Sequence, residues 1–314
     1  MRSRCLLLGV LLAVFGLPVH AAHGQSVSGE ILAPIGRQVG WLNLDAPRPR
    51  LLTSFQSPVI ASDVAALAGS SQAVVATSEG DLLALDLSSS QLSMLVARAE
   101  PAESLGLPAW WPNGAGLLFQ RQDFSVAGVV YPGASSTSYP SRIEAVQPDG
   151  SGRRVLIADG RQPAPAPDGV HIAFVRTSPE GAGLHVWSDG LEQVLIPEGR
   201  FADLAYPRYA PQGDRLAFAA PGSFPSGSML IAASLARLAH GVPWDVWLVN
   251  ADGSAPRRLA ELGADDGSIT WSPDGSSLFI YGGTGSFLVD AASGAVMPLP
   301  YISGYGATAW LPAT

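Results

Sequence analysis

The sequence contains one cysteine and no lysine. The cysteine is Cys5, at the start of an apolar N-terminal run, so the rest of the chain can form no disulfide and has no thiol nucleophile. The absence of lysine excludes a Schiff-base lysine, a phosphate-loop lysine and a Ser-Lys catalytic pair. All 18 basic residues are arginine.

Charge is also scarce. Charged residues make up 14% of the chain, and the formal net charge is −8. An acidic surface repels nucleic acid and anionic lipid, so we expect no nucleic-acid partner. Apolar residues reach 47%, with 35 glycines and 26 prolines, and this composition favours many short strands with tight turns over disorder.

One long apolar run is present, over residues 5–19, preceded by two arginines and followed by small residues. This pattern is typical of a secretory signal peptide, which we expect over residues 1–24 with cleavage after either Ala21 or Gly24. About 20 apolar residues are needed to cross a membrane, so an uncleaved anchor is the less favoured alternative. The mature chain, residues 25–314, is then expected to be secreted or periplasmic and free of the membrane.

A short turn motif recurs along the chain, and its clearest copy is Trp271-Ser272-Pro273-Asp274-Gly275. The other copies, each followed by a short apolar run, are Trp111-Pro112-Asn113-Gly114, Ala166-Pro167-Asp168-Gly169 and Ala210-Pro211-Gln212-Gly213. Proline sets φ at the second position of a type I turn, Asp or Asn bonds its own backbone, and glycine takes the left-handed position before the next strand. Each copy therefore predicts a hairpin, and we assign its acidic residue to turn geometry.

The copies recur with an underlying period of about 40 residues, the length of a four-stranded propeller blade. Two gaps between copies are longer, because each holds an insertion, near residues 121–141 and 221–244. A degenerate copy without the Pro-Asp-Gly turn lies at residues 66–75. The sequence therefore predicts a single all-β domain, a β-propeller of four-stranded blades.

The ring is expected to close by pairing the two ends of the chain. Ala309-Trp310-Leu311-Pro312 begins a copy that is one strand long, and the N-terminal strands expected near 31–35, 38–44 and 50–55 lack an inner strand. Together the ends complete one blade, which leaves no open seam. Six blades result, with five or seven as alternatives. The other five are expected over residues 58–100, 101–160, 161–200, 201–263 and 264–303.

A second turn joins the third and fourth strands of a blade, as in Asn250-Ala251-Asp252-Gly253-Ser254 and Gln147-Pro148-Asp149-Gly150-Ser151. The combination of Ser-Pro-Asp-Gly and Asn-Ala-Asp-Gly-Ser turns resembles the TolB-type WD-like propeller repeat. The resemblance covers about residues 29–314. It implies a six-bladed β-propeller in the periplasm or another extracytoplasmic compartment.

Catalytic motifs are scarce. The chain has no Gly-x-Ser-x-Gly elbow. His171 and His185 are expected in strands and His240 at the end of the second insertion, and no two histidines have a metal-ligand spacing. We therefore expect no metal site and no cofactor. Asp265-Asp266 could contribute oxygen ligands to calcium, but solvated loop carboxylates are the favoured interpretation.

The two insertions are the segments that the repeat does not explain. Both follow the second strand of their blade, so strand parity places both on the face opposite the Pro-Asp-Gly turns. The second has apolar residues at helical spacing, which predicts a short amphipathic helix. Long loops on a rigid scaffold are where binding residues concentrate. The candidate binding residues are Arg121, Asp123, Tyr131, Tyr139, Phe224, Arg237 and Trp244.

These patterns favour a monomeric, non-catalytic binding propeller that holds a protein or another extracellular ligand on the insertion-bearing face. The alternative is a hydrolase or lyase with carboxylates, with or without a metal, in the central funnel. A buried cluster of three or more Asp, Glu or His side chains at the channel mouth would favour the enzyme. An apolar or aromatic patch between the loops would favour the binding protein.

Overall fold

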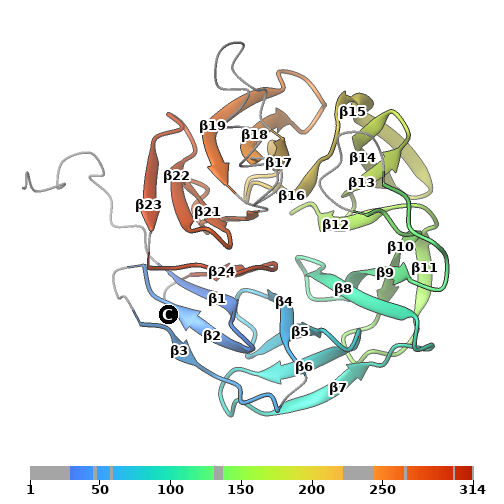
Figure 1. Ribbon diagram of the computed structural model, residues 1–314, viewed down its shortest axis with the longest axis vertical. Helices are drawn as coiled ribbons and strands as arrows, with labels where there is room; N and C mark the ends of the chain where they lie inside the picture. Colours follow the sequence, from blue (N-terminus) through green and yellow to red (C-terminus); the bar gives the residue numbers. More distant parts are fainter. Residues whose placement is uncertain are drawn as a thin grey trace, which may run out of the picture.

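The computed structural model describes residues 29–44, 48–56, 59–130, 137–221, 244–264, 267–299 and 301–312. Within these residues the chain forms six antiparallel sheets of four strands each, arranged as blades around one axis (Figure 1). The predicted six-bladed β-propeller is therefore confirmed. The signal peptide expected in residues 1–24 and the helix expected within the second insertion lie outside the described residues.

The strands of each blade run from an innermost strand at the central axis to an outermost strand at the rim. From the inside outward, blade 1 contains β24 (Ala309–Leu311), β1 (Glu30–Ile35), β2 (Gln38–Leu42) and β3 (Arg50–Leu51). Blade 2 contains β4 (Ala61–Ala66), β5 (Gln72–Thr77), β6 (Leu82–Asp86) and β7 (Leu92–Val96). Blade 3 contains β8 (Glu103–Trp110), β9 (Leu117–Asp123), β10 (Ser141–Val146) and β11 (Arg154–Ile157).

The remaining three blades follow the same order of strands. Blade 4 contains β12 (Arg161–Pro165), β13 (Ile172–Ser178), β14 (Gly181–Ser188) and β15 (Leu191–Phe201). Blade 5 contains β16 (Ala205–Tyr209), β17 (Arg215–Pro221), β18 (Trp244–Asn250) and β19 (Arg257–Ala264). Blade 6 contains β20 (Ser268–Trp271), β21 (Ser277–Tyr281), β22 (Ser286–Asp290) and β23 (Val296–Leu299).

The two ends of the chain close the ring in blade 1, as expected. β24 pairs antiparallel with β1, with Ile31 opposite Trp310 and Leu32 opposite Ala309. Trp310 then packs with residues of blades 1 and 6 in one core cluster. Both edges of the seam are therefore covered by backbone hydrogen bonds and by packing.

The third N-terminal strand is shorter than expected, because side chains replace most of its backbone pairing. β3 contains only Arg50 and Leu51. Beyond it, Thr53 Oγ1 accepts from the N–H of Val39 at 2.9 Å, and the N–H of Phe55 donates to Gln38 Oε1 at 2.7 Å. These bonds hold the segment beside β2 without a ladder.

The hydrophobic core is divided into six clusters, one at each junction between neighbouring blades. The second strand of each blade supplies both of its flanking clusters, because successive side chains on a strand point to opposite faces. In β9, Leu117 and Phe119 pack toward blade 2, whereas Leu118 packs toward blade 4. In β13, Ile172 and Phe174 pack toward blade 3 in the same way. The apolar runs after the turn glycines are therefore inter-blade packing.

A left-handed residue that is not glycine recurs in the inner strands of three successive blades. Leu107, Gln162 and Tyr206 have φ values of 50°, 58° and 52°, and each sits at a bulge in the pairing with the second strand. Each N–H donates to a side chain of the preceding blade. The acceptors are Asp63 Oδ2 for Leu107 at 3.3 Å, Gln120 Oε1 for Gln162 at 3.1 Å and Gln162 Oε1 for Tyr206 at 2.6 Å. Bulges re-aim the chain locally, and in this ring they connect blade to blade.

Candidate functional site: the insertion face

The two insertions leave corresponding ends of their blades. The first connects Asp123 at the end of β9 to Ser141 at the start of β10, and the second connects Pro221 to Trp244, which pair at the ends of β17 and β18. The Pro-Asp-Gly turns join the first and second strands at the opposite end. Because all six blades repeat one order of antiparallel strands around the ring, both insertions start on one face. We call it the insertion face, and the other the turn face.

The described part of the first insertion is a folded structure with two limbs, residues 124–130 and 137–140. Val129 and Ser138 exchange two backbone hydrogen bonds of 2.7 Å. The rings of Phe124 and Tyr139 meet edge to face, with centroids 4.6 Å apart. The N–H of Phe124 also donates to the carbonyl of Ala102 at 2.8 Å. The loop is therefore fixed to blade 3 at its base and across its limbs.

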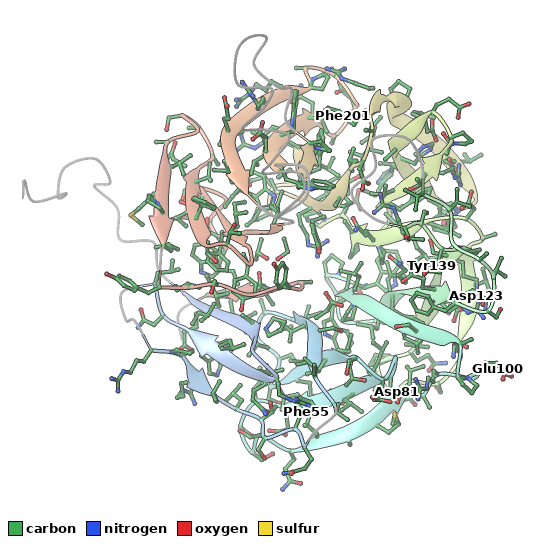
Figure 2. The ribbon with its side chains drawn as sticks, viewed as in Figure 1. Phe55, Asp81, Glu100, Asp123, Tyr139 and Phe201 are labelled. Carbon is green, nitrogen blue, oxygen red and sulfur yellow. The ribbon has the colours of Figure 1, made fainter. Side chains whose placement is uncertain are left out.

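Two pockets lie beside Tyr139. One has a volume of about 230 Å³ and lies between the first insertion and blade 4, and Val126, Val129 and Thr177 are among the residues that line it. The other, of about 160 Å³, lies between the same loop and the bulged starts of the inner strands, and Leu107 and Gln162 line it. Ser138, Tyr139, Arg161 and Thr177 line both pockets. Figure 2 shows Tyr139 and Asp123 in the same sector of the ring.

An apolar strip adjoins these pockets on the first limb. It consists of Phe124, Val126, Val129 and Val130, and all four side chains are exposed, with Val130 at 68%. A folded loop has no packing reason to present four apolar side chains to water. Clustered exposure of this kind marks interaction surfaces.

One fixed cation contributes to both pockets. Arg161 Nη2 donates to Asp203 Oδ1 at 2.6 Å and to the carbonyl of Leu204 at 2.9 Å, and its Nε donates to Thr177 Oγ1 at 2.9 Å. Because the guanidinium is held from two blades, its position is set before any partner arrives. Arginine is one of the residue types enriched among interface anchors.

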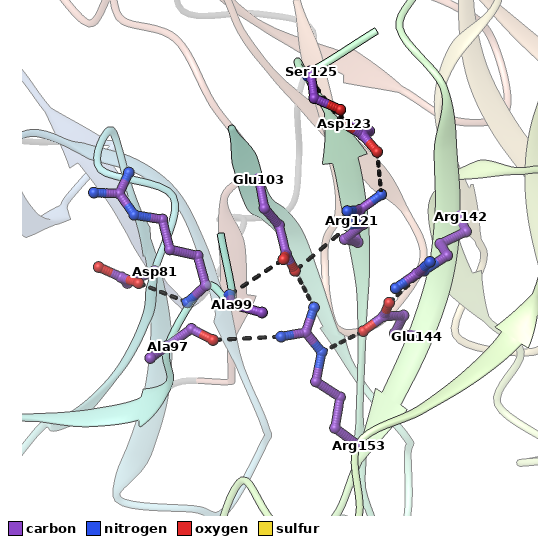
Figure 3. Close-up of polar contacts among 11 residues, drawn as sticks. Asp81, Ala97, Ala99, Glu103, Arg121, Asp123, Ser125, Arg142, Glu144 and Arg153 are labelled. Atoms are coloured by element: carbon purple, nitrogen blue, oxygen red, sulfur yellow. Dashed lines mark hydrogen bonds and ion pairs between the residues drawn. The ribbon is translucent and has the colours of Figure 1, made fainter. Parts of the chain in front are cut away.

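Arg121 and Asp123 belong to an ion-pair network at the root of the insertion (Figure 3). Arg121 Nη1 lies 3.0 Å from Asp123 Oδ2, and its Nε lies 3.7 Å from Glu103 Oε1. Arg153 bridges the buried carboxylates of Glu103 and Glu144. Asp123 also accepts from the hydroxyl and the N–H of Ser125, and these bonds, with Arg121, lower the pKa of Asp123 to about 2. The network fixes the start of the loop.

Burial alone would raise the pKa of Glu103. The hydrogen bond and charge of Arg153, the N–H of Ala99 and the charge of Arg121 outweigh that effect, so the pKa lies below its ordinary value of 4.5. Glu103 is therefore an ionised, paired carboxylate whose function in the fold is to hold blade 3 together.

The structure places the predicted binding residues in different surroundings. Tyr139 lies at the pockets. Arg121 and Asp123 lie at the loop root, where their charges are already paired. Trp244 is only 4% exposed and packs in the core between blades 5 and 6, so the expectation that it is a surface anchor is wrong. In the sequence Trp244 directly follows the second insertion, and nothing there indicates that it begins β18. Tyr131, Phe224 and Arg237 lie outside the described residues.

Sequence reasoning missed Val126, Val129, Val130, Arg161 and Gln162. The three valines carried a readable signal, because apolar residues in a loop rich in glycine and serine are unexpected on a solvated segment. Arg161 and Gln162 carried none, because they begin an inner strand and reach the pockets only through a bulge.

The central channel has a separate cavity of about 240 Å³, lined by residues of all six inner strands. Its lining is mainly Ala, Pro, Val and Trp side chains, and Arg208 is the single charged residue among those lining it in the described part of the chain. The lining belongs to the last residues of the inner strands, such as Trp110, Tyr209 and Trp271, so this cavity lies toward the turn face.

The histidines are placed differently from one another. His171 was expected in a strand, but it lies one residue before β13, where its Nδ1 is 2.6 Å from Asp168 Oδ2 in the turn. His185 lies in β14 and is buried, with Nδ1 2.7 Å from Glu192 and Nε2 2.9 Å from Glu198. In the part of the chain that the structure describes, no group of three or more His, Cys, Asp or Glu side chains is arranged to hold a metal ion. His240 and Asp265-Asp266 fall outside it.

Comparisons with known proteins identify the fold. No protein-family model and no curated protein matches the chain. The structure of TolB from Acinetobacter baumannii is 17% identical, with a TM-score of 0.66 over 91% of this chain and 67% of that chain. A chain from a nidogen/laminin complex is 13% identical, with a TM-score of 0.61 over 89% and 97%. An oligogalacturonate lyase from Vibrio parahaemolyticus is 11% identical, with a TM-score of 0.52 over 83% and 70%.

These likenesses show a TolB-like propeller fold. One similar structure comes from a protein complex and another is a lyase, so the fold does not select the activity. Among the described residues, no helix has the length and apolar character needed to cross a membrane.

Proposed function

We propose that the chain is an exported, non-catalytic propeller that binds a protein partner on its insertion face. The observation that supports this best is the exposed apolar strip beside two pockets that share Tyr139. Buried aromatic anchors and preformed hollows are typical of protein interfaces. The ring holds these groups rigidly, so little conformational freedom is lost when a partner binds.

The chemistry of the pockets describes the partner surface. An aliphatic or aromatic side chain fits the pocket that Val126, Val129 and Tyr139 line. A carbonyl or carboxylate beside it can accept from Arg161, whose guanidinium is already oriented by Asp203. The second insertion starts on the same face in blade 5, and we propose that Phe224 and Arg237 extend the contact surface from there.

The repeat, the location and the assembly complete this proposal. The Ser-Pro-Asp-Gly and Asn-Ala-Asp-Gly-Ser turns support membership of the TolB-type WD-like repeat family. Export rests on the leader expected over residues 1–24. N-terminal sequencing of the protein recovered outside the cytoplasm should give Ala22 or Gln25 as the first residue, and sedimentation of the purified protein should give a monomer.

The alternative, a hydrolase or lyase with carboxylates in the central funnel, is not favoured. Among the described residues that line the channel cavity, the only charged side chain is that of Arg208. General acid–base chemistry on a sugar or ester requires positioned carboxylates or imidazoles at the reacting group. The observed lining supplies neither.

Site-specific photocrosslinking tests the proposed binding face. A photoreactive phenylalanine analogue is placed at Val130 in the apolar strip and, as a matched control, at Val155, an equally apolar exposed residue on β11 of the same blade. In cells that export the protein, position 130 should give a discrete crosslinked product, and this product should disappear when Tyr139→Ala is added. The same products from both positions would rule out a defined partner on the insertion face.

A further inference from the structure

Arg208 lines the central channel, and it forms no ion pair with any residue that the structure describes. It lies in β16, and its Nη1 donates to the carbonyl of Pro207 at 2.9 Å. Within the described residues, no carboxylate oxygen lies within ion-pair distance of its guanidinium. Among the described residues that line this cavity, Arg208 is the only one with a charged side chain. Arg208 is half-buried, and a charged group that is partly withdrawn from water is normally paired.

Among the described residues, the carboxylate whose charge acts on Arg208 is that of Asp63, and both of its oxygens accept other hydrogen bonds. Burial lowers the pKa of Arg208, and electrostatic interactions with Tyr206 and Asp63 act in the opposite direction. Asp63 uses one carboxylate oxygen for the N–H of Leu107 and the other for the N–H of Ala307. The guanidinium stays protonated at neutral pH because arginine is not deprotonated in proteins. Arg208 therefore has charge and hydrogen-bond donors to offer.

Uncharged polar groups lie around the same cavity. Burial, and to a smaller extent the charge of Asp168, raises the pKa of Tyr209 to about 12, so its hydroxyl is protonated. Thr270 and Thr308 also line the cavity, but their hydroxyls lie 2.7 Å apart and bond each other, and that of Thr270 donates to the carbonyl of Thr308 at 3.0 Å. The remaining walls are apolar and come from side chains such as Leu67, Pro165 and Trp271.

We infer that this end of the channel binds a small organic monocarboxylate, with its carboxylate on Arg208 and its apolar body against the proline, alanine and tryptophan walls. A single guanidinium balances a single negative charge, and its planar fork matches a carboxylate in two parallel hydrogen bonds. A phosphate dianion would leave one charge uncompensated among apolar walls. The cavity of about 240 Å³ admits a ligand of a few carbon atoms. The site is at the opposite end of the channel from the pockets of Tyr139, so it does not depend on the proposed function.

Thermal unfolding and calorimetric titration of the full mature chain test this site, with hexanoate as the probe. Hexanamide has the same shape without the charge, and inorganic phosphate has charge without the apolar body. A ligand that binds only the folded state raises the melting temperature with its concentration. Hexanoate should give a saturable rise and a measurable heat, and hexanamide and phosphate should give at most a tenth of the affinity.

Variants separate binding at Arg208 from a general effect of salt. Arg208→Gln should abolish the response to hexanoate, and Arg208→Lys should weaken it about tenfold, because lysine keeps the charge without the planar fork. Arg257→Gln removes the same charge from the exposed outer strand of the same blade and should leave the response unchanged. If Arg208→Gln does not fold, the Arg208→Lys comparison decides the matter. An equal response in wild type and Arg208→Lys, no response to hexanoate, or an equal response to phosphate would each overturn the inference.

Discussion

Asp63 and Ala307 are 244 residues apart in the chain, yet the N–H of Ala307 donates to Asp63 Oδ1 at 2.9 Å. The other oxygen of the same carboxylate accepts from the N–H of Leu107 at 3.3 Å. One side chain of blade 2 therefore ties the approach to the closing strand in blade 1 to the inner strand of blade 3. The ring is held by this contact as well as by the pairing of β24 with β1.

Asp63→Ala is expected to destabilise the fold by about 2–4 kcal/mol, because it leaves the buried N–H of Ala307 and the part-buried N–H of Leu107 without acceptors, at about 1–3 kcal/mol each. Asp159→Ala, which removes an exposed carboxylate between blades 3 and 4, should cost about 0.5 kcal/mol or less. Urea unfolding of both variants measures the difference. Equal midpoints would show that the carboxylate does not support the closure.

Deletion of residues 304–314 should abolish cooperative unfolding. It removes β24, exposes the paired edge of β1 and takes Trp310 out of the cluster between blades 6 and 1. A chain that ends at residue 312 keeps the whole of β24 and serves as the control. Near-ultraviolet circular dichroism and melting curves compare the two, and a deletion protein that melts like the control would refute closure by the chain ends.

The repeat and its register could be predicted from the sequence, because both depend on local chemistry. The Pro-Asp-Gly turns fix where hairpins begin, and period-two alternation then decides which residues face each neighbouring blade, as with Leu117 and Leu118. Degeneracy in blade 2 did not obscure the count, because the flanking copies set the spacing. The ends could be matched because Trp310 repeats the position of Trp271.

The sites could be predicted only in part, because they depend on positions that bulges and long-range contacts set. The pockets combine a loop of blade 3 with the start of β12, and no local pattern places Arg161 beside Tyr139. In the sequence Arg208 looks like an ordinary strand residue. Only the arrangement of the six inner strands shows that it is the single charged side chain in the described lining of the channel cavity. The prediction for Trp244 is wrong for a related reason. Trp244 is buried because it packs at the junction between blades 5 and 6, and its place beside the loop in the sequence does not indicate this.

Gly275→Val should cost about 2 kcal/mol, several times more than Ser276→Ala. Gly275 has a φ of 74°, where a β-branched side chain is strained by about 1–3 kcal/mol. Its new Cβ would also displace the side chain of Gln212, which bonds the carbonyl of Asp274 at 3.0 Å. Ser276 loses only an exposed hydroxyl contact with Asp274. Denaturant midpoints for the two variants should differ clearly, and similar values would contradict the turn assignment.

Glu103→Gln should destabilise the protein in a pH-dependent way. The folded pKa of Glu103 lies below its ordinary value of 4.5, so its ionised form stabilises the fold above about pH 4.5, and that contribution is lost as pH falls through the folded pKa. The stability gap between wild type and Glu103→Gln should therefore be full near pH 7 and shrink below about pH 4.5. Glu100→Gln removes an exposed charge three residues earlier and controls for net charge. A gap that stays constant with pH would show that the pairing with Arg153 does not contribute.

Tyr139→Ala should weaken binding of the crosslinked partner by about 10- to 100-fold, in the range typical of an interface anchor. Tyr139 lines both pockets and packs its ring against Phe124, so its removal opens the floor of the proposed contact surface. Val130→Asp should weaken binding, because the new carboxylate would have to lose its water when the partner binds. The fold should stay intact, because Val130 is exposed. Tyr301→Ala, at an 83% exposed tyrosine after blade 6, is the matched control. Titration calorimetry with the purified partner gives the affinities. If all three variants bind as the wild type does while melting normally, the propeller fold stands and the insertion face is not where the partner binds.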